Sequence, residues 1–155
     1  MEQTPQRDNI KYSILTNGLM FREFYNTVPH VINNLQELGV SIDGASKETY
    51  EKLRLGGRWE KILEGLECMT ELKKKYNFRF SLHMVVQQEN WHEVESMLEL
   101  GRTYNVDRIY FNKIEDWNTG IDFESQTFTE LEEFKKSIRR VSTDPIVWNN
   151  VVTLT

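Results

Sequence analysis

The sequence predicts an α/β fold in which parallel strands alternate with helices. Short apolar segments repeatedly end in turn-forming dipeptides, and apolar residues at helical spacing fill the stretches between them. One segment, residues 78–86, alternates apolar and mostly polar side chains as a strand with two different faces does. Because parallel strands are joined by helical crossovers, this order favours a parallel sheet with helices on its outer face.

The first two predicted strands cover residues 12–16 and 38–42, and they end in Asn-Gly and Asp-Gly turns. A helix is expected between them, with Pro29 near its start. Its apolar positions follow helical spacing: Val28, Val31, Ile32 and Leu35. The order is therefore strand, helix, strand.

The next section predicts a short helix and then a long one. Ser46 is placed to cap a helix over residues 47–53, because a serine hydroxyl can accept from a free amide of the first turn. A longer helix follows Gly57, with apolar residues three or four positions apart: Ile62, Leu66, Met69, Leu72 and Tyr76. The strand over residues 78–86 comes after it.

The second half repeats the pattern. Asn90 and Glu93 have the spacing of a capping box that starts the next helix. A strand is expected over residues 108–112, and a last helix from about Thr129. The buried stripes of these two helices are Val94, Met97, Leu98 and Gly101, and Leu131, Phe134, Ile138 and Val141. The segment from Thr143 onward is weakly patterned.

The alternation along the strands predicts one apolar and one polar face. Phe80 and its apolar alternates would lie under the helices, and Ser81 and His83 would lie on the opposite face. The same parity puts Ser41 and Asp43 on that polar face. Ligands of such folds bind at the carboxyl ends of the strands, so this edge of the sheet is the predicted site.

Bulk properties exclude several classes of protein. The 155 residues suffice for one domain, and 39% hydrophobic and 28% charged residues are ordinary globular usage. A net charge of −5 predicts no nucleic-acid partner, and the absence of a long apolar run predicts no membrane span and a cytoplasmic location. The single cysteine, Cys68, excludes an intrachain disulfide and any multi-cysteine metal site, so no metal ligands are assigned.

Four segments resemble the later part of the radical S-adenosylmethionine (radical SAM) core. They are LTNG (residues 15–18), GVSIDGASKETYEKLR (39–54), the glycine pair that follows, and VVQQEN (85–90). The resemblance covers roughly residues 12–112 and implies part of a (βα)6 partial barrel. In that family the barrel holds a [4Fe-4S] cluster and S-adenosylmethionine, whose reductive cleavage yields a 5′-deoxyadenosyl radical.

The resemblance implies a set of S-adenosylmethionine contacts. Ser41 matches a polar position that contacts the ribose or the amino-acid end, with Asp43 beside it, and Arg54 matches an arginine that pairs with the cofactor carboxylate. Val86 matches the neighbourhood of an apolar position that packs on adenine. Asn17 and Asn90 fall near the cofactor side of the cavity.

The family's CxxxCxxC motif and its Gly-Gly-Glu motif are missing from this sequence. Since thiolates hold the cluster, no [4Fe-4S] cluster is expected on this chain alone, and the chain alone is predicted not to cleave S-adenosylmethionine. The leading interpretation is a fragment or truncated form of a radical SAM enzyme. It divides into a flexible segment (1–11), the partial barrel (12–142) and a tail (143–155).

Two alternatives remain open at this point. The chain could be a non-catalytic binding or assembly module, which would form a homodimer or bind a partner chain through the open edge of strand 12–16. It could instead be an unrelated βα enzyme that uses His83 with nearby carboxylates. His83 by itself is more often a hydrogen-bonded structural residue. The sequence indicates no substrate.

Overall fold

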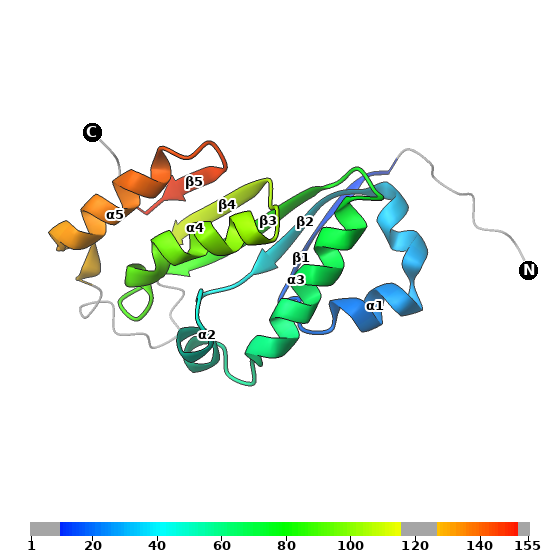
Figure 1. Cartoon of the computed structure of the whole chain (residues 1–155), viewed down its shortest axis with the longest axis horizontal. Helices are drawn as coiled ribbons and strands as arrows, with labels where there is room; N and C mark the ends of the chain where they lie inside the picture. Colours follow the sequence, from blue (N-terminus) through cyan, green and yellow to red (C-terminus); the bar gives the residue numbers. More distant parts are fainter. Residues whose placement is uncertain (1–9, 116–126, 152–155) are drawn as a thin grey trace, which may run out of the picture.

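The computed structural model describes residues 10–115 and 127–151, which form one parallel five-stranded sheet in the order β1-β2-β3-β4-β5 (Figure 1). The strands are β1 (Tyr12–Thr16), β2 (Leu35–Ser41), β3 (Arg79–Val86), β4 (Arg108–Lys113) and β5 (Val147–Asn150). Every neighbouring pair is parallel, and the order of the strands in the sheet follows their order in the chain. The predicted α/β fold is confirmed, and the sheet is open rather than closed into a barrel.

Helices connect the strands and cover one face of the sheet (Figure 1). They are α1 (Phe21–Thr27), α2 (Lys47–Leu53), α3 (Trp59–Lys73), α4 (Val94–Thr103) and α5 (Glu132–Ser142), with 3₁₀ turns η1 (Pro29–Asn34), η2 (Trp91–Glu93) and η3 (Phe128–Glu130). The short helix α2 follows β2 and lies near the end of that strand (Figure 1). That position places its residues next to the carboxyl edge of the sheet.

The two faces of the sheet differ as the alternation predicts. Phe80, Leu82 and Met84 of β3 have no exposed surface and belong to the core beneath the helices. The residues between them face the other way, and the strand register aligns them in rows across the sheet. One row joins Ser41, His83, Tyr110 and Trp148. We call this side of the sheet, which the described helices do not cover, the open face.

The prediction for the first crossover helix is wrong in its boundaries. The α-helix comes earlier, at Phe21–Thr27, and Pro29 begins a separate 3₁₀ turn. A proline disfavours helical geometry at the preceding residue, and Val28 has φ −133° and ψ 60°. Leu35, which the helical spacing included, is the first residue of β2.

The prediction of a capping box at Asn90 and Glu93 is also wrong. Neither side chain caps its own helix. Both reach other parts of the chain, as described below. The weakly patterned segment after Thr143 contains β5, which pairs with β4 from Ile109 to Asn112.

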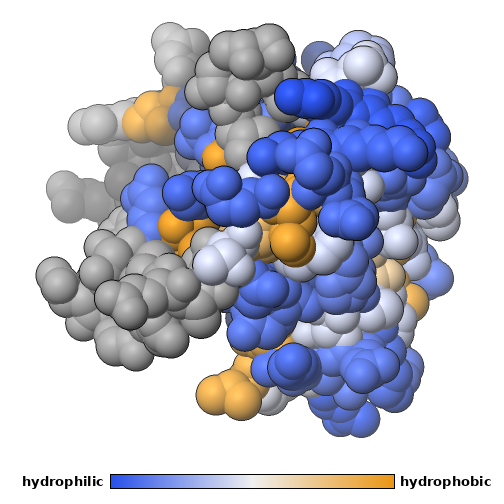
Figure 2. All heavy atoms as spheres, turned by 90° about the vertical axis from the view of Figure 1, so that its left-hand side faces the viewer, coloured by the Kyte–Doolittle hydropathy of each residue, from blue (hydrophilic) through white to orange (hydrophobic). Residues whose placement is uncertain are grey.

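No helix in the described part of the chain is long and apolar enough to cross a membrane. Figure 2 views the molecule from the side of α5 and β5, where hydrophilic side chains cover most of the described surface and hydrophobic ones form small patches. The exposed large hydrophobic residues are Ile10, Leu15, Met20, Phe24, Leu55, Val85 and Trp148. Of these, Leu15, Val85 and Trp148 belong to the open face.

Candidate functional site

An ion pair between Asp43 and Arg54 lies at the carboxyl end of β2. Asp43 Oδ2 accepts from Arg54 Nε at 2.8 Å and from Nη2 at 2.7 Å. The other oxygen, Oδ1, accepts from the backbone N of Val85 at 2.9 Å. The carboxylate therefore joins the end of β2 to β3 and at the same time holds the guanidinium that follows α2. Two of the predicted site residues are brought together, and they bind each other.

Ser41 lies half-buried on the open face, two residues before Asp43. Its hydroxyl makes no hydrogen bond to another described residue. Ser46, by contrast, has the predicted structural role, since its Oγ accepts from the Thr49 amide at 3.3 Å at the start of α2. Ser41 is thus the serine at this edge that has a hydroxyl available for a ligand.

Asn90 is completely buried and its side chain is fully used within the protein. Its Nδ2 donates to the carbonyl oxygens of Asp43 at 2.9 Å and Val85 at 2.8 Å, and its Oδ1 accepts from the Gln87 amide at 2.8 Å. The amide thus clamps the ends of β2 and β3 and closes the turn after β3. Asn90 therefore holds the backbone of Asp43 in place, and it has no exposed surface to offer a ligand.

Glu93 connects α2 to the start of α4. Its Oε2 accepts from the Ala45 amide at 2.6 Å, and its Oε1 accepts from the hydroxyls of Ser46 at 2.5 Å and Thr49 at 2.7 Å. Burial by itself would raise the pKa of Glu93, but these hydrogen bonds outweigh burial and the pKa is lowered. Sequence reasoning assigned this residue to the wrong helix, because the spacing to Asn90 fits a local capping box.

The other two predicted site residues, Asn17 and Val86, are poorly placed to contact a ligand at this edge. Asn17 is exposed after β1, and its Oδ1 accepts from the Leu19 amide at 3.2 Å in a local turn. Val86 has no exposed surface and packs in the core under the helices. Val85, one residue earlier, is the position on this strand that presents an apolar side chain to the open face, with 36% of its surface exposed.

Tyr50 of α2 was not predicted as a site residue. It is fully buried, and its hydroxyl has no hydrogen-bond partner among the described residues. Burial raises the pKa of this hydroxyl, and the charges of Arg54 and Asp43 also act on it. A buried hydroxyl without a described partner is unusual in a native protein, but this one has no exposed surface through which a ligand could reach it.

A chain of polar side chains crosses the open face toward the amino ends of the strands. The Ser81 hydroxyl donates to Glu37 Oε1 at 3.0 Å and lies 3.1 Å from His83 Nε2. Arg79 completes the chain through an ion pair with Glu37. Strand parity placed Ser81 and His83 on this face, but the sequence did not reveal their connection to Glu37.

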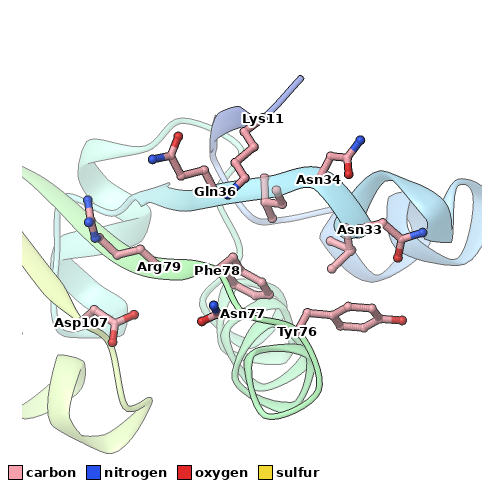
Figure 3. A pocket seen from close by; sticks show the side chains of 11 residues that line it. Lys11, Asn33, Asn34, Gln36, Tyr76, Asn77, Phe78, Arg79 and Asp107 are labelled. Carbon is pink, nitrogen blue, oxygen red and sulfur yellow. The ribbon is translucent and has the colours of Figure 1, made fainter. Parts of the chain in front are cut away.

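A separate cleft of about 660 Å³ opens at the amino ends of β2 and β3, away from the predicted site. Figure 3 shows its lining of amide and charged side chains, including Lys11, Asn34 and Asn77. Arg79 already pairs with Glu37, although it borders this cleft. Most of the lining residues are polar and exposed, with the buried Ile32, Leu35 and Phe78 at its base, so the carboxyl edge is the better candidate for a specific site.

Cys68 does not fit an iron–sulfur cluster. It lies on α3 beside Arg22 and Tyr25, in the helical layer on the covered side of the sheet. Burial raises the pKa of its thiol, which disfavours the thiolate that binds iron. The 155-residue sequence contains no second cysteine, and the described residues contain no group of three or more histidine, cysteine or acidic side chains that could hold a metal ion.

The sequence matches one family and two curated relatives. Residues 2–101 match the model of the Radical SAM superfamily. AdoMet-dependent heme synthase of Methanosarcina barkeri is 29% identical over 99 residues, which are 60% of this chain and 26% of that protein. Probable GTP 3′,8-cyclase of Saccharolobus islandicus is 25% identical over 136 residues, which are 83% of this chain and 42% of that protein. The chain spans less than half the length of either relative.

Solved structures share the fold. A crystal structure of Streptococcus suis SuiB bound to S-adenosylmethionine aligns with a TM-score of 0.60 and 12% identity, covering 94% of this chain and 32% of that chain. The structure of TYW1 with a lysine-pyruvate adduct aligns with a TM-score of 0.59 and 17% identity, covering 89% and 42%. At these identities the likeness shows the arrangement of strands and helices alone.

Proposed function

This chain belongs to the radical SAM superfamily, and from that premise we propose that the carboxyl edge of its sheet binds S-adenosylmethionine. The observation that carries the proposal is the cluster of Ser41, Asp43 and Arg54 at one edge, with groups left over for a ligand. S-adenosylmethionine has a carboxylate and ribose hydroxyls that such groups can bind. When bound, it supplies the sulfonium whose reductive cleavage characterises the family.

Each residue has a separate part in the proposed binding. Arg54 would bind the cofactor carboxylate, since Asp43 occupies Nε and Nη2 and leaves Nη1 without a described partner. Ser41 would donate to the ribose or to the amino-acid end. Asp43 positions the guanidinium, and Asn90 positions Asp43.

The proposal assigns the iron–sulfur cluster to protein outside this sequence. One cysteine cannot supply the thiolates that hold a [4Fe-4S] cluster, so this chain is the S-adenosylmethionine-binding side of a radical SAM enzyme, as a fragment or a truncated form. Reconstitution with iron and sulfide is expected to leave the purified chain without the absorbance of a cluster. Stoichiometric uptake of four irons per chain would contradict this assignment.

Isothermal titration of the chain with S-adenosylmethionine tests the binding site. We expect saturable binding and a loss of about tenfold or more in affinity in Arg54→Ala, because a hydrogen bond to a charged group contributes about 1.5–3 kcal/mol. Ser41→Ala should weaken binding less, since its bond is neutral on the protein side. Arg139→Ala is the matched control, because Arg139 is exposed on α5.

Two results would contradict the proposed binding site. Binding that is unchanged in both Arg54→Ala and Ser41→Ala would place S-adenosylmethionine elsewhere. Absence of any binding to the native chain would remove the proposal for this chain alone. Circular dichroism of each variant separates a lost contact from a lost fold.

An assembly role is the second candidate, and the position of β1 at the end of the sheet favours it. β1 pairs only with β2 among the described strands, and Leu15 of β1 is 62% exposed. An unpaired strand edge is a template for another chain. We propose that a second copy or a partner chain pairs there.

Sedimentation velocity over a wide concentration range tests this assembly. The native chain should show concentration-dependent dimers, and Ser13→Lys on β1 should shift it toward monomer, because a lysine on an edge opposes pairing. Ser96→Lys on the exposed side of α4 is the control. A native chain that stays monomeric at the highest concentration would count against self-association.

A further inference from the structure

His83 has a fixed pattern of hydrogen bonds on the open face. A hydroxyl carries one hydrogen, and that of Ser81 is donated to Glu37 Oε1 at 3.0 Å. His83 Nε2 lies 3.1 Å from the oxygen of the same Ser81 hydroxyl. Because the only hydrogen of that hydroxyl is donated to Glu37, Nε2 is the donor in the contact between His83 and Ser81. The ion pair of Glu37 with Arg79 keeps the carboxylate in place as the terminal acceptor.

This arrangement leaves Nδ1 of His83 as a hydrogen-bond acceptor. In a neutral imidazole with hydrogen on Nε2, Nδ1 carries a free lone pair. Burial lowers the pKa of His83, although the charge of Glu37 acts in the opposite direction, so the neutral form is favoured near neutral pH. The described residues provide no partner for Nδ1.

The ring is oriented by Gly39, which registers with Ser81 on the neighbouring strand. A Cβ on Gly39 would lie 2.8 Å from His83 Nε2 and 3.1 Å from Cδ2, so this edge of the imidazole lies directly over the glycine. The opposite edge, which carries Nδ1 and Cε1, faces away from Gly39. Because Gly39 has no side chain, the His83 ring can lie over it, and Nδ1 of that ring then faces away from Ser81.

Aromatic rings continue from His83 across the open face. The rings of His83 and Tyr110 are stacked, with centroids 4.5 Å apart and planes 22° apart. The ring centroids of Tyr110 and Trp148 are 6.5 Å apart, and Trp148 is 57% exposed. These three residues are register partners on β3, β4 and β5 and form a row of planar side chains that we call the aromatic row.

We propose that the aromatic row binds a planar ring that carries an N–H or O–H donor, with His83 Nδ1 as the acceptor of that hydrogen. This inference deepens the proposed function, because the open face is continuous with the proposed S-adenosylmethionine edge through Ser41, the register partner of His83. The aromatic row provides a surface on which a planar ring can stack. The hydrogen-bonded Glu37–Ser81–His83 chain leaves His83 Nδ1 as an acceptor, so it selects a ring that carries a hydrogen-bond donor. His83 acts here as a positioning and specificity residue for a heteroaromatic substrate.

A matched pair of probes tests the inference. Indole and 1-methylindole have nearly the same stacking surface, but only indole has an N–H donor. In titrations of the native chain followed by ¹⁵N NMR, indole should bind about two- to tenfold more tightly, the value of one net hydrogen bond, and should shift the His83 Nδ1 resonance. The free chain should show hydrogen on Nε2 of His83.

Variants separate the acceptor from the stacking surface. His83→Phe should bring the affinity ratio of the two probes to about one, and Trp148→Ala should weaken both probes alike. His30→Phe is the matched control, because His30 is exposed in η1. Ser81→Ala should mix the two His83 tautomers and reduce the ratio. Should a variant not fold, the tautomer and the probe ratio of the native chain still decide the question.

Three results would overturn the inference: hydrogen on Nδ1 of His83 in the free chain, equal affinities for the two probes, or no binding of either. These outcomes differ from failure of the proposed function. Loss of S-adenosylmethionine binding with a retained preference for indole would remove the cofactor site and keep the donor-selective aromatic row. The converse would remove only the present inference.

Discussion

Replacing Glu93 with alanine is expected to lower the free energy of unfolding by about 3 kcal/mol. The substitution removes a buried carboxylate that accepts three hydrogen bonds, from the Ala45 amide and the hydroxyls of Ser46 and Thr49. Bonds to a charged group contribute about 1.5–3 kcal/mol each, and the donors left behind regain only part of this from water. Urea denaturation of both proteins at pH 7 measures the difference.

A matched glutamate and a pH series sharpen this test. Glu99→Ala should change stability by less than about 0.5 kcal/mol, because Glu99 is exposed on α4 and its ion pair with Arg102 is also exposed. The pKa of Glu93 is lower in the folded chain, so its charge stabilises the fold above the unfolded pKa near 4.5, and this contribution is lost as pH falls through the folded pKa. The stability gap between native and Glu93→Gln should therefore narrow at low pH. A gap that does not change with pH would contradict the role of the charge.

The Glu93 variant also links stability to the proposed site. Glu93 fixes the start of α2, and Arg54 directly follows the end of that short helix. Loss of this anchor should loosen Arg54 and weaken S-adenosylmethionine binding in the fraction of protein that remains folded. Unchanged affinity would show that Asp43 alone positions the guanidinium.

Replacing Asn90 with alanine should cost about 3 kcal/mol as well. The change leaves the partly buried carbonyls of Asp43 and Val85 and the amide of Gln87 without their partner, and an unpaired group costs up to about 1–3 kcal/mol when buried and less where water enters. Asn26→Ala is the control, because Asn26 is exposed on α1 and should change stability by less than about 0.5 kcal/mol. Thermal and urea denaturation report the difference.

A second substitution distinguishes the hydrogen bonds from simple packing. Asn90→Asp keeps the size of the side chain but sets an oxygen against the two carbonyl oxygens that Nδ2 now contacts. It should destabilise the chain at pH 7 at least as much as alanine does. An Asn90→Asp chain as stable as the native one would show that the clamp contributes little, whatever the alanine result.

Much of the fold follows from local patterns. The alternation over residues 78–86 predicts which side chains of β3 are buried, because successive side chains of any strand point to opposite faces. The same rule placed Ser41 and Asp43 on the open face. Ser46 caps α2 as expected, since that bond reaches only to Thr49 in the first turn. Pro29 is also a local signal, because a proline disfavours helical geometry at the residue before it and so ends α1 before Val28.

Other features could not be read from spacing, because their partners are distant in sequence. Glu93 and Asn90 have the spacing of a capping box, yet Glu93 binds Ala45, 48 residues earlier, and Asn90 binds Asp43, 47 residues earlier. β5 has little pattern of its own and is a strand because β4 offers it an edge. Local sequence cannot decide between a near and a far hydrogen-bond partner when the same side chain could bind either one.

The sequence by itself determined the alternation of helices with the first four strands, the two-faced sheet, the polar residues at its carboxyl edge and the lack of cysteines for a cluster. Those properties depend on residue type and on the periods of strands and helices, which are local. Only the tertiary structure decided that Arg54 pairs with Asp43, that Asn90 and Glu93 hold the edge together, and that Glu37 fixes His83 through Ser81. Those contacts depend on strand register and on helix placement, which the packing of the whole core sets.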